Sequence, residues 1–209
     1  GEADLQVANP EGSELMVYLK DNGRFQASKS FPTFSAISSM AGGRFFRTKE
    51  EAVIALSREE KNLGVSRYNE DGRLSFPRLI QVAEGEPLVC TAINLDEDEF
   101  DELALVQETE NGMQLVIAKP AQREKFTSEW EILLQIDLPE VRRKPEAIRD
   151  LNVFGQRGTG LMVFVPRESP VFLARSLGGE PYELEVVAER SSIRESLLKE
   201  ITPSQVSEV

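Results

Sequence analysis

The chain has 209 residues, of which 40% are hydrophobic, and a formal net charge of −12. This composition supports a folded core, and the negative charge argues against nucleic acid as a partner because phosphates would be repelled. Histidine is absent, which removes histidine-based catalysis and most zinc sites, and the single cysteine, Cys90, allows no internal disulfide. No apolar run approaches the roughly 18 residues of a membrane helix, so we expect no membrane insertion.

Short apolar or alternating segments follow one another along the chain, separated by turns rich in Gly, Asn, Asp and Pro. This pattern is typical of β-strands. In chain order, the predicted strands cover residues 4–7, 15–19, 23–25, 34–40, 52–56, 63–68, 72–74, 87–95, 102–106, 113–118, 125–126, 145–151, 161–165, 171–174, 181–182 and 201–209. Near the C-terminus, Ser192 and Glu195 form a capping box that predicts a short helix over residues 191–200.

The predicted strands repeat as groups. Four kinds of segment recur in one order roughly every 50 residues, which is close to the size of one four-stranded β-propeller blade. The turns at 21–23 and 69–72 agree, because glycine and asparagine tolerate the positive φ of hairpin turns. We therefore predict an all-β fold, a single domain over residues 1–209, built as a β-propeller of about four four-stranded blades. A two-sheet sandwich is the alternative.

The segment 93–106, with the sequence INLDEDEFDELALV, resembles the hallmark of FG-GAP/VCBS repeats. In that family an acidic loop, D-x-D-x-D-G-x-x-D-L, joins the first strand of a blade to the second and often holds calcium, as in integrin α-subunit propellers. The approach to this strand, residues 76–87, is also similar to the family. The resemblance covers all four repeats, but only this repeat keeps the acidic loop.

The resemblance implies one calcium site in this loop. Matched residue by residue, its ligands would be the side chains of Asn94, Asp96, Asp98 and Glu102 and the backbone carbonyl of Phe100. The sequence departs from the family twice. Position six is Glu99 in place of the usual glycine, so we expect Glu99 to take the sharp turn of the loop without the freedom of glycine, and position one is the neutral Asn94. The alternative is a solvated acidic turn that carries no ion.

The equivalent loops of two other repeats have lost their acidic residues. Arginines stand in the loop at 41–47 where carboxylates would be, and a guanidinium could replace the charge of the ion there. The loop at 150–157 keeps only the first residues of the acidic motif, at 150–152. We expect both loops to be free of metal.

The two ends of the chain match complementary parts of the repeat. Residues 1–5 resemble the second half of an acidic loop, and residues 201–209 resemble the strand that enters one. In one interpretation the chain is a piece of a longer propeller. In the other, which we favour, it closes into a four-bladed ring whose last strand completes the first blade and hides exposed sheet edges.

The predicted function is that of a non-catalytic binding or structural module, a monomer that presents propeller loops to a protein or glycan. The family resemblance implies a secreted, periplasmic or cell-surface setting. The alternative is a carbohydrate-active hydrolase or lyase that uses carboxylates in the central channel. Acidic residues do cluster at 96–102 and 108–110, but such clusters in turns are more often solvated surfaces than acid–base pairs.

Overall fold

The computed structural model describes residues 5–9, 11–47, 51–69, 71–153, 156–175 and 182–186. Within these ranges the chain forms antiparallel β-sheets and no helix, which confirms the all-β prediction for them. The predicted helix at 191–200 and the predicted strand at 201–209 lie outside the described residues. Nowhere in the described ranges is there a helix that could cross a membrane.

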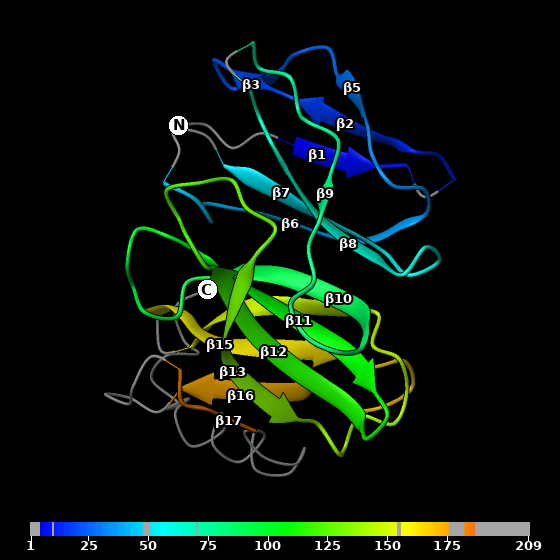
Figure 1. Ribbon diagram of the computed structural model, residues 1–209, viewed down its shortest axis with the longest axis vertical. Helices are drawn as coiled ribbons and strands as arrows, with labels where there is room; N and C mark the ends of the chain where they lie inside the picture. The colour runs from blue at the N-terminus through cyan, green and yellow to red at the C-terminus, as the bar shows by residue number, and fades with distance from the viewer. Residues whose placement is uncertain are drawn as a thin grey trace, which may run out of the picture.

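Four sheets follow one another along the chain (Figure 1). The first has three strands in the order β1–β2–β5, and a small ribbon, β3–β4, extends from it. Their bounds are β1 (Leu5–Ala8), β2 (Glu14–Tyr18), β3 (Lys20–Asp21), β4 (Arg24–Phe25) and β5 (Lys29–Pro32). The second sheet has four strands in chain order: β6 (Ile37–Gly43), β7 (Ala52–Ser57), β8 (Asn62–Arg67) and β9 (Arg78–Leu79).

The third and fourth sheets repeat the arrangement of the second. The third consists of β10 (Glu86–Ile93), β11 (Glu102–Thr109), β12 (Gly112–Pro120) and β13 (Trp130–Asp137). The fourth consists of β14 (Ala147–Val153), β15 (Gln156–Phe164), β16 (Val171–Arg175) and β17 (Leu184–Val186). Three of the four sheets therefore have the four strands in simple succession that the repeat predicts.

Each sheet packs its face against the next, and the core is divided among the spaces between them. One apolar cluster joins the first and second sheets through Leu15 and Val53, a second joins the second and third sheets, and the largest joins the third and fourth. A middle sheet is thus covered on both faces. This explains why β7 and the first six residues of β11 are buried at every position, and why most of these positions, Ala52–Leu56 and Leu103–Val106, are apolar.

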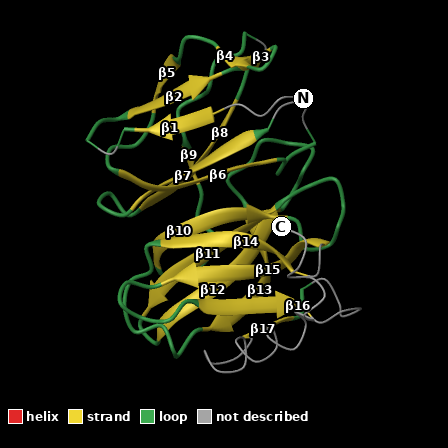
Figure 2. Cartoon of the chain, turned by 180° about the vertical axis from the view of Figure 1, so that it is seen from behind, coloured by secondary structure: helices red, strands yellow, loops and turns green. Residues whose placement is uncertain are grey.

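The first strands of the four-stranded sheets lie next to one another. Strand β10 contacts both β6 and β14, while the other strands of each sheet lead away from this line (Figure 2). In Figure 1 the first sheet lies at the top and the fourth at the bottom, and no apolar cluster of the described residues joins them. Four stacked sheets do not match a two-sheet sandwich, and a closed ring is not seen within the described residues.

The third strand segment of each repeat was predicted too early in the chain. The predicted segments at 23–25, 72–74 and 125–126 are a separate ribbon, an isolated bridge and a loop, and the outermost strands begin later, at Lys29, Arg78 and Trp130. For two of these segments the reason is that an apolar residue packs inward from a connection: Leu74 is buried beneath the first sheet, and Phe126 packs beside Phe46. Phe25, in the ribbon, is exposed. The segment at 181–182 lies mostly outside the described residues; the strand there, β17, begins at Leu184.

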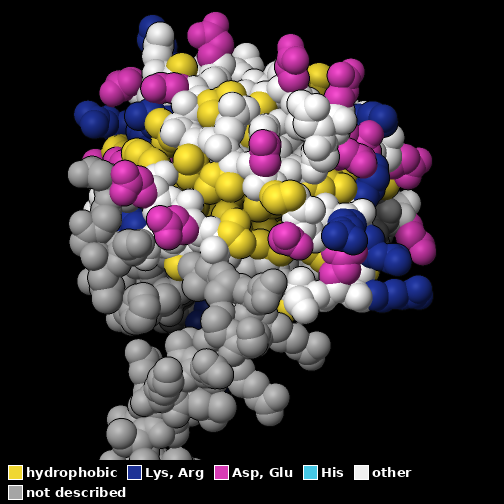
Figure 3. All heavy atoms as spheres, turned by 90° about the horizontal axis from the view of Figure 1, so that it is seen from below, with side chains coloured by type: hydrophobic (Ala, Val, Ile, Leu, Met, Phe, Trp, Pro, Cys, Tyr) yellow, Lys and Arg dark blue, Asp and Glu magenta, His cyan; other side chains and the backbone are white. Residues whose placement is uncertain are grey.

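The surface at the fourth-sheet end carries hydrophobic, acidic and basic side chains. Viewed from below, hydrophobic groups gather toward the centre, with acidic and basic groups around them (Figure 3). On the fourth sheet, Phe164 and Val186 are among the exposed large hydrophobic residues.

Candidate metal-binding loop

The acidic loop lies between the first and second strands of the third sheet. It leaves β10 after Ile93 and enters β11 at Glu102. Carboxylate oxygens of Asp96, Asp98 and Glu102 all lie within 4.8 Å of one another. Two oxygens bound to one calcium at about 2.3–2.6 Å can be at most about 5 Å apart, so this spacing is compatible with a shared ion. The structure therefore brings together the three acidic residues that the sequence singled out.

Asn94, the predicted first ligand, carries an unpaired oxygen. Its side-chain nitrogen donates a hydrogen bond to the backbone carbonyl of Asp98 at 2.6 Å, whereas its Oδ1 is buried and has no hydrogen-bond partner. A buried polar atom without a partner is costly and needs an explanation, and a bound cation supplies one. With the three carboxylates, the residues present fit a hard, oxygen-binding divalent cation.

Hydrogen bonds within the loop fix its shape. The Asp98 N–H donates to Asp96 Oδ1 at 3.2 Å, and the Phe100 N–H donates to Asp98 Oδ1 at 2.6 Å. The residue with a positive φ is Glu97, at 61°, and not Glu99. The expectation that Glu99 would have to take the sharp turn of the family's glycine is therefore wrong: in this loop the left-handed residue comes two positions earlier.

Glu102 is the most buried acidic residue of this loop, with 0% of its surface exposed. Its Oε2 accepts a hydrogen bond from the Leu95 N–H at 3.0 Å, and its Oε1 forms an ion pair with Arg123 at 2.7 Å. Burial raises the pKa of Glu102 to about 7; nearby Asp96 adds to the rise, and the Leu95 and Arg123 hydrogen bonds oppose it. Each carboxylate oxygen has a second lone pair, so these partners leave room for a cation.

Arg175 of the fourth sheet and Tyr182, just before β17, hold the loop from the other side. Arg175, on β16, donates to the carbonyl of Leu95 and to Glu97 Oε1, each at 2.6 Å. The Tyr182 hydroxyl donates to Asp96 Oδ2 at 2.7 Å, and burial together with this bond raises the pKa of Tyr182. The loop is therefore a junction between the third and fourth sheets.

Phe100, the predicted backbone ligand, also has a structural role. Its side chain is buried, and the guanidinium groups of Arg44, Arg47 and Arg123 lie 5.6, 5.7 and 4.8 Å from the centre of its ring. Cation–π contacts of this kind hold arginines beside the acidic loop. Coordination by the carbonyl of Phe100 remains a prediction.

One arginine of the second-sheet loop, Arg44, reaches acidic residues of this neighbouring loop. The Arg44 N–H donates to Asp101 Oδ2 at 2.7 Å, and its guanidinium lies 3.5 Å from Glu99. The same loop buries Phe45 and Phe46 against Trp130, so Trp130 packs between two sheets. The side chains of the corresponding fourth-repeat loop, from residue 152 onward, lie outside the described residues.

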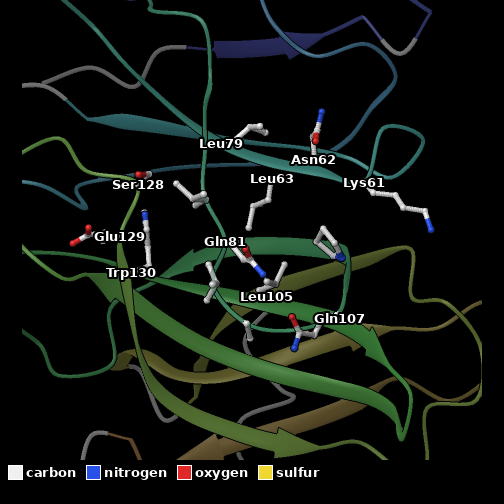
Figure 4. Close-up of a pocket in the computed structure, with 15 residues that line it drawn as sticks. Lys61, Asn62, Leu63, Leu79, Gln81, Leu105, Gln107, Ser128, Glu129 and Trp130 are labelled. Atoms are coloured by element: carbon white, nitrogen blue, oxygen red, sulfur yellow. The ribbon is translucent and has the colours of Figure 1, made fainter.

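The structure also contains a cavity of about 720 Å³ between the second and third sheets (Figure 4). The side chains that line it include Leu63, Gln81, Leu105, Gln107 and Trp130. Among the residues lining this cavity, Glu129 is the only acidic one. The cavity therefore lacks the pair of carboxylates that acid–base cleavage of a glycosidic bond requires.

No family model matches the chain, and no curated protein matches it. Among solved structures, a crystal structure of a Lactobacillus plantarum protein from a structural genomics programme is similar, with a TM-score of 0.56 and 10% sequence identity. The match covers 88% of this chain and 52% of the other, so the chain spans about half the length of that structure. A likeness at this identity shows a shared fold and no more.

Proposed function

We propose that the chain is part of a degenerate β-propeller of the FG-GAP/VCBS type and acts as a non-catalytic binding or structural module. The repeated four-stranded sheets support this, as does the position of β10 beside both β6 and β14, because propeller blades place their first strands around a common axis. Following the resemblance, the module belongs to a secreted, periplasmic or cell-surface protein and presents its loops to a protein or a glycan.

The observation that carries the proposal is the arrangement of the acidic loop. Three carboxylates converge in the loop that also carries the buried, unpaired Oδ1 of Asn94. The loop joins the first two strands of a sheet, which is where the family holds calcium. The loop contacts the fourth repeat through Arg175 of β16 and Tyr182 just before β17. One Ca²⁺ bound here would reinforce the junction between two sheets and stiffen the scaffold, which is a structural role and involves no catalysis.

Calorimetric titration with Ca²⁺ at pH 8 tests this proposal, since Glu102 is ionised above its pKa of about 7. We expect one site per chain. Asp98→Asn should weaken binding at least roughly tenfold, because it removes one charged ligand. Asp101→Asn is the matched control: it is the same change in the same loop, at a carboxylate that instead accepts the Arg44 N–H and lies outside the convergent group. An absence of heat in the wild type, or equal binding by both variants, refutes the calcium site.

The hydrolase alternative gains no support from the acidic loop. Asp96 and Glu102 are close enough to act as a pair, and the raised pKa of Glu102 is what a general acid needs. However, Glu102 is fully buried and its oxygens are bonded to Leu95 and Arg123, so a sugar has no access to it. We therefore do not propose catalysis.

A further inference from the structure

Arginine side chains gather at one end of the second and third sheets. Because successive strands are antiparallel, the connection between the first two strands and that between the last two lie at the same end of each sheet. Five arginines lie in these connections or at the strand ends beside them: Arg44, Arg47, Arg67, Arg78 and Arg123. We call this group the arginine surface.

Two phenylalanine rings hold these arginines in two groups. Three of them surround the ring of Phe100, as described above. The guanidinium carbons of Arg67 and Arg78 lie 4.9 and 4.7 Å from the centre of the Phe126 ring. The guanidinium carbons of Arg67 and Arg78 are therefore at most about 10 Å apart, since each lies within 4.9 Å of the same centre.

Backbone and ring contacts join the two groups into one surface. The Arg47 N–H donates a hydrogen bond to the carbonyl of Arg123 at 2.6 Å. Phe46, the residue before Arg47, packs its ring 5.4 Å from that of Phe126. The guanidinium of Arg78 in turn donates to the Phe126 carbonyl at 2.9 Å. The two groups therefore lie side by side across the boundary between the second and third sheets.

Part of the arginine surface has no acidic partner. Two of the five arginines pair with glutamates of the acidic loop. The other three, Arg47, Arg67 and Arg78, are exposed and form no ion pair with a carboxylate in the part of the chain that the structure describes. Positive charges held close together repel one another, and an anionic ligand would relieve this repulsion.

The geometry of the arginine surface fits an extended acidic peptide. In an extended segment, side chains on one face recur every two residues, about 7 Å apart. Acidic residues at alternate positions can therefore reach both Arg67 and Arg78. A sugar has little ring surface to stack on here, because Phe100 is buried and two guanidinium groups lie over Phe126. Arginine and aromatic residues are also enriched at interfaces between proteins.

We propose that the arginine surface binds an acidic segment of another protein, whose Asp or Glu side chains pair with Arg47, Arg67 and Arg78. This proposal rests on the binding role given under Proposed function and names the class of partner, but it does not depend on calcium. The net charge of −12 does not oppose it, because at 0.1 M ionic strength charges more than about 10 Å away are largely screened.

Fluorescence anisotropy with labelled poly-L-glutamate, at 0.1 M salt and with a calcium chelator, tests the proposal. The double change Arg67→Gln and Arg78→Gln should weaken binding at least roughly tenfold, because two charge-assisted pairs are lost. The matched control is Arg24→Gln with Arg142→Gln, the same change in charge at exposed arginines outside the arginine surface, and it should bind like the wild type. Since calcium is absent, this measurement and the calcium titration can fail separately.

Competition experiments distinguish the class of partner. The competitors are polygalacturonate, a glycan with carboxylate groups, and a DNA oligonucleotide. We expect both to displace poly-L-glutamate less well than unlabelled poly-L-glutamate does; equal or better displacement by either contradicts a protein partner. No binding of poly-L-glutamate to the wild type, or equal binding by the two double variants, overturns the proposal.

Phenylglyoxal labelling of the unaltered chain decides the question if the double variant does not fold. This reagent modifies arginine, and mass spectrometry follows each site. Poly-L-glutamate should slow the labelling of Arg47, Arg67 and Arg78 at least roughly threefold, because paired guanidinium groups are shielded, and should leave Arg24 unaffected. Unchanged labelling at the three arginines, or equal slowing at Arg24, contradicts the proposal.

Discussion

Within the acidic loop, a few residues decide both stability and cation binding. Asp96, Asp98 and Glu102 converge as the sequence predicts, because alternate loop positions preceding a strand direct side chains to one side. The partners Arg123, Arg175 and Tyr182 could not be found this way. They come from distant parts of the chain, and no local pattern marks an arginine or tyrosine as the neighbour of a carboxylate that folding brings near.

The buried carboxyl of Glu102 makes a testable contribution to the pH dependence of stability. Its pKa is raised from 4.5 to about 7 in the folded protein, so the folded state keeps a proton that the unfolded state has released. The contribution is therefore fully present below about pH 4.5 and is lost as the pH rises through 7, by at most roughly 3 kcal/mol without calcium.

Chemical denaturation of calcium-free protein at pH 5 and pH 8 measures this effect as the difference between wild type and Glu102→Gln. The variant, which cannot ionise, should lose less stability between the two pH values than the wild type. If the free energies of unfolding of the variant and the wild type change equally between the two pH values, Glu102 does not titrate in this range.

Among the strands, the inner ones could be predicted from sequence and the outermost ones could not. Four inner strands lie close to their predicted ranges because each is apolar or is bounded by turns: β7, β8, β11 and β12. Strand β13 is largely half-buried or exposed along its length, so its sequence carries neither a continuous apolar run nor a clean alternation. The aromatic residues of the loops preceding the outer strands gave a stronger but misleading signal.

Close packing of β8 against a connection predicts a sharp difference between two glycines. A Cβ atom on Gly64 would lie 2.7 Å from the ring of Phe34 and 2.9 Å from Pro77, and Phe34 is itself held by an edge contact with Phe76. We expect Gly64→Ala to lower the free energy of unfolding by about 1–3 kcal/mol.

The matched control for this change is Gly42→Ala in β6, where the nearest atom to an added Cβ is Gln6 Oε1 at 3.9 Å. Its effect should stay within about 0.5 kcal/mol of wild type. Denaturant titration compares the two variants, and equal losses of stability would mean that the packing around Gly64 is looser than described.

At the scale of the molecule, the sequence repeat predicts the number and succession of the sheets because each repeat is one packing unit. What it cannot predict is how the ends meet, since closure depends on the angle between successive sheets and not on any single segment. The described residues show three sheets with four strands, a first sheet with three, and a hollow beside β1. Local patterns thus specify the repeated unit, while long-range packing determines the acidic junction.

A crystal structure of the chain grown with calcium chloride tests the central claim most directly. The account predicts that β6, β10 and β14 surround one axis as first strands of successive blades, with one cation held by side-chain oxygens of Asn94, Asp96, Asp98 and Glu102. Sheets that face each other in pairs without a common axis would contradict it, as would an acidic loop that excludes the cation at saturating calcium.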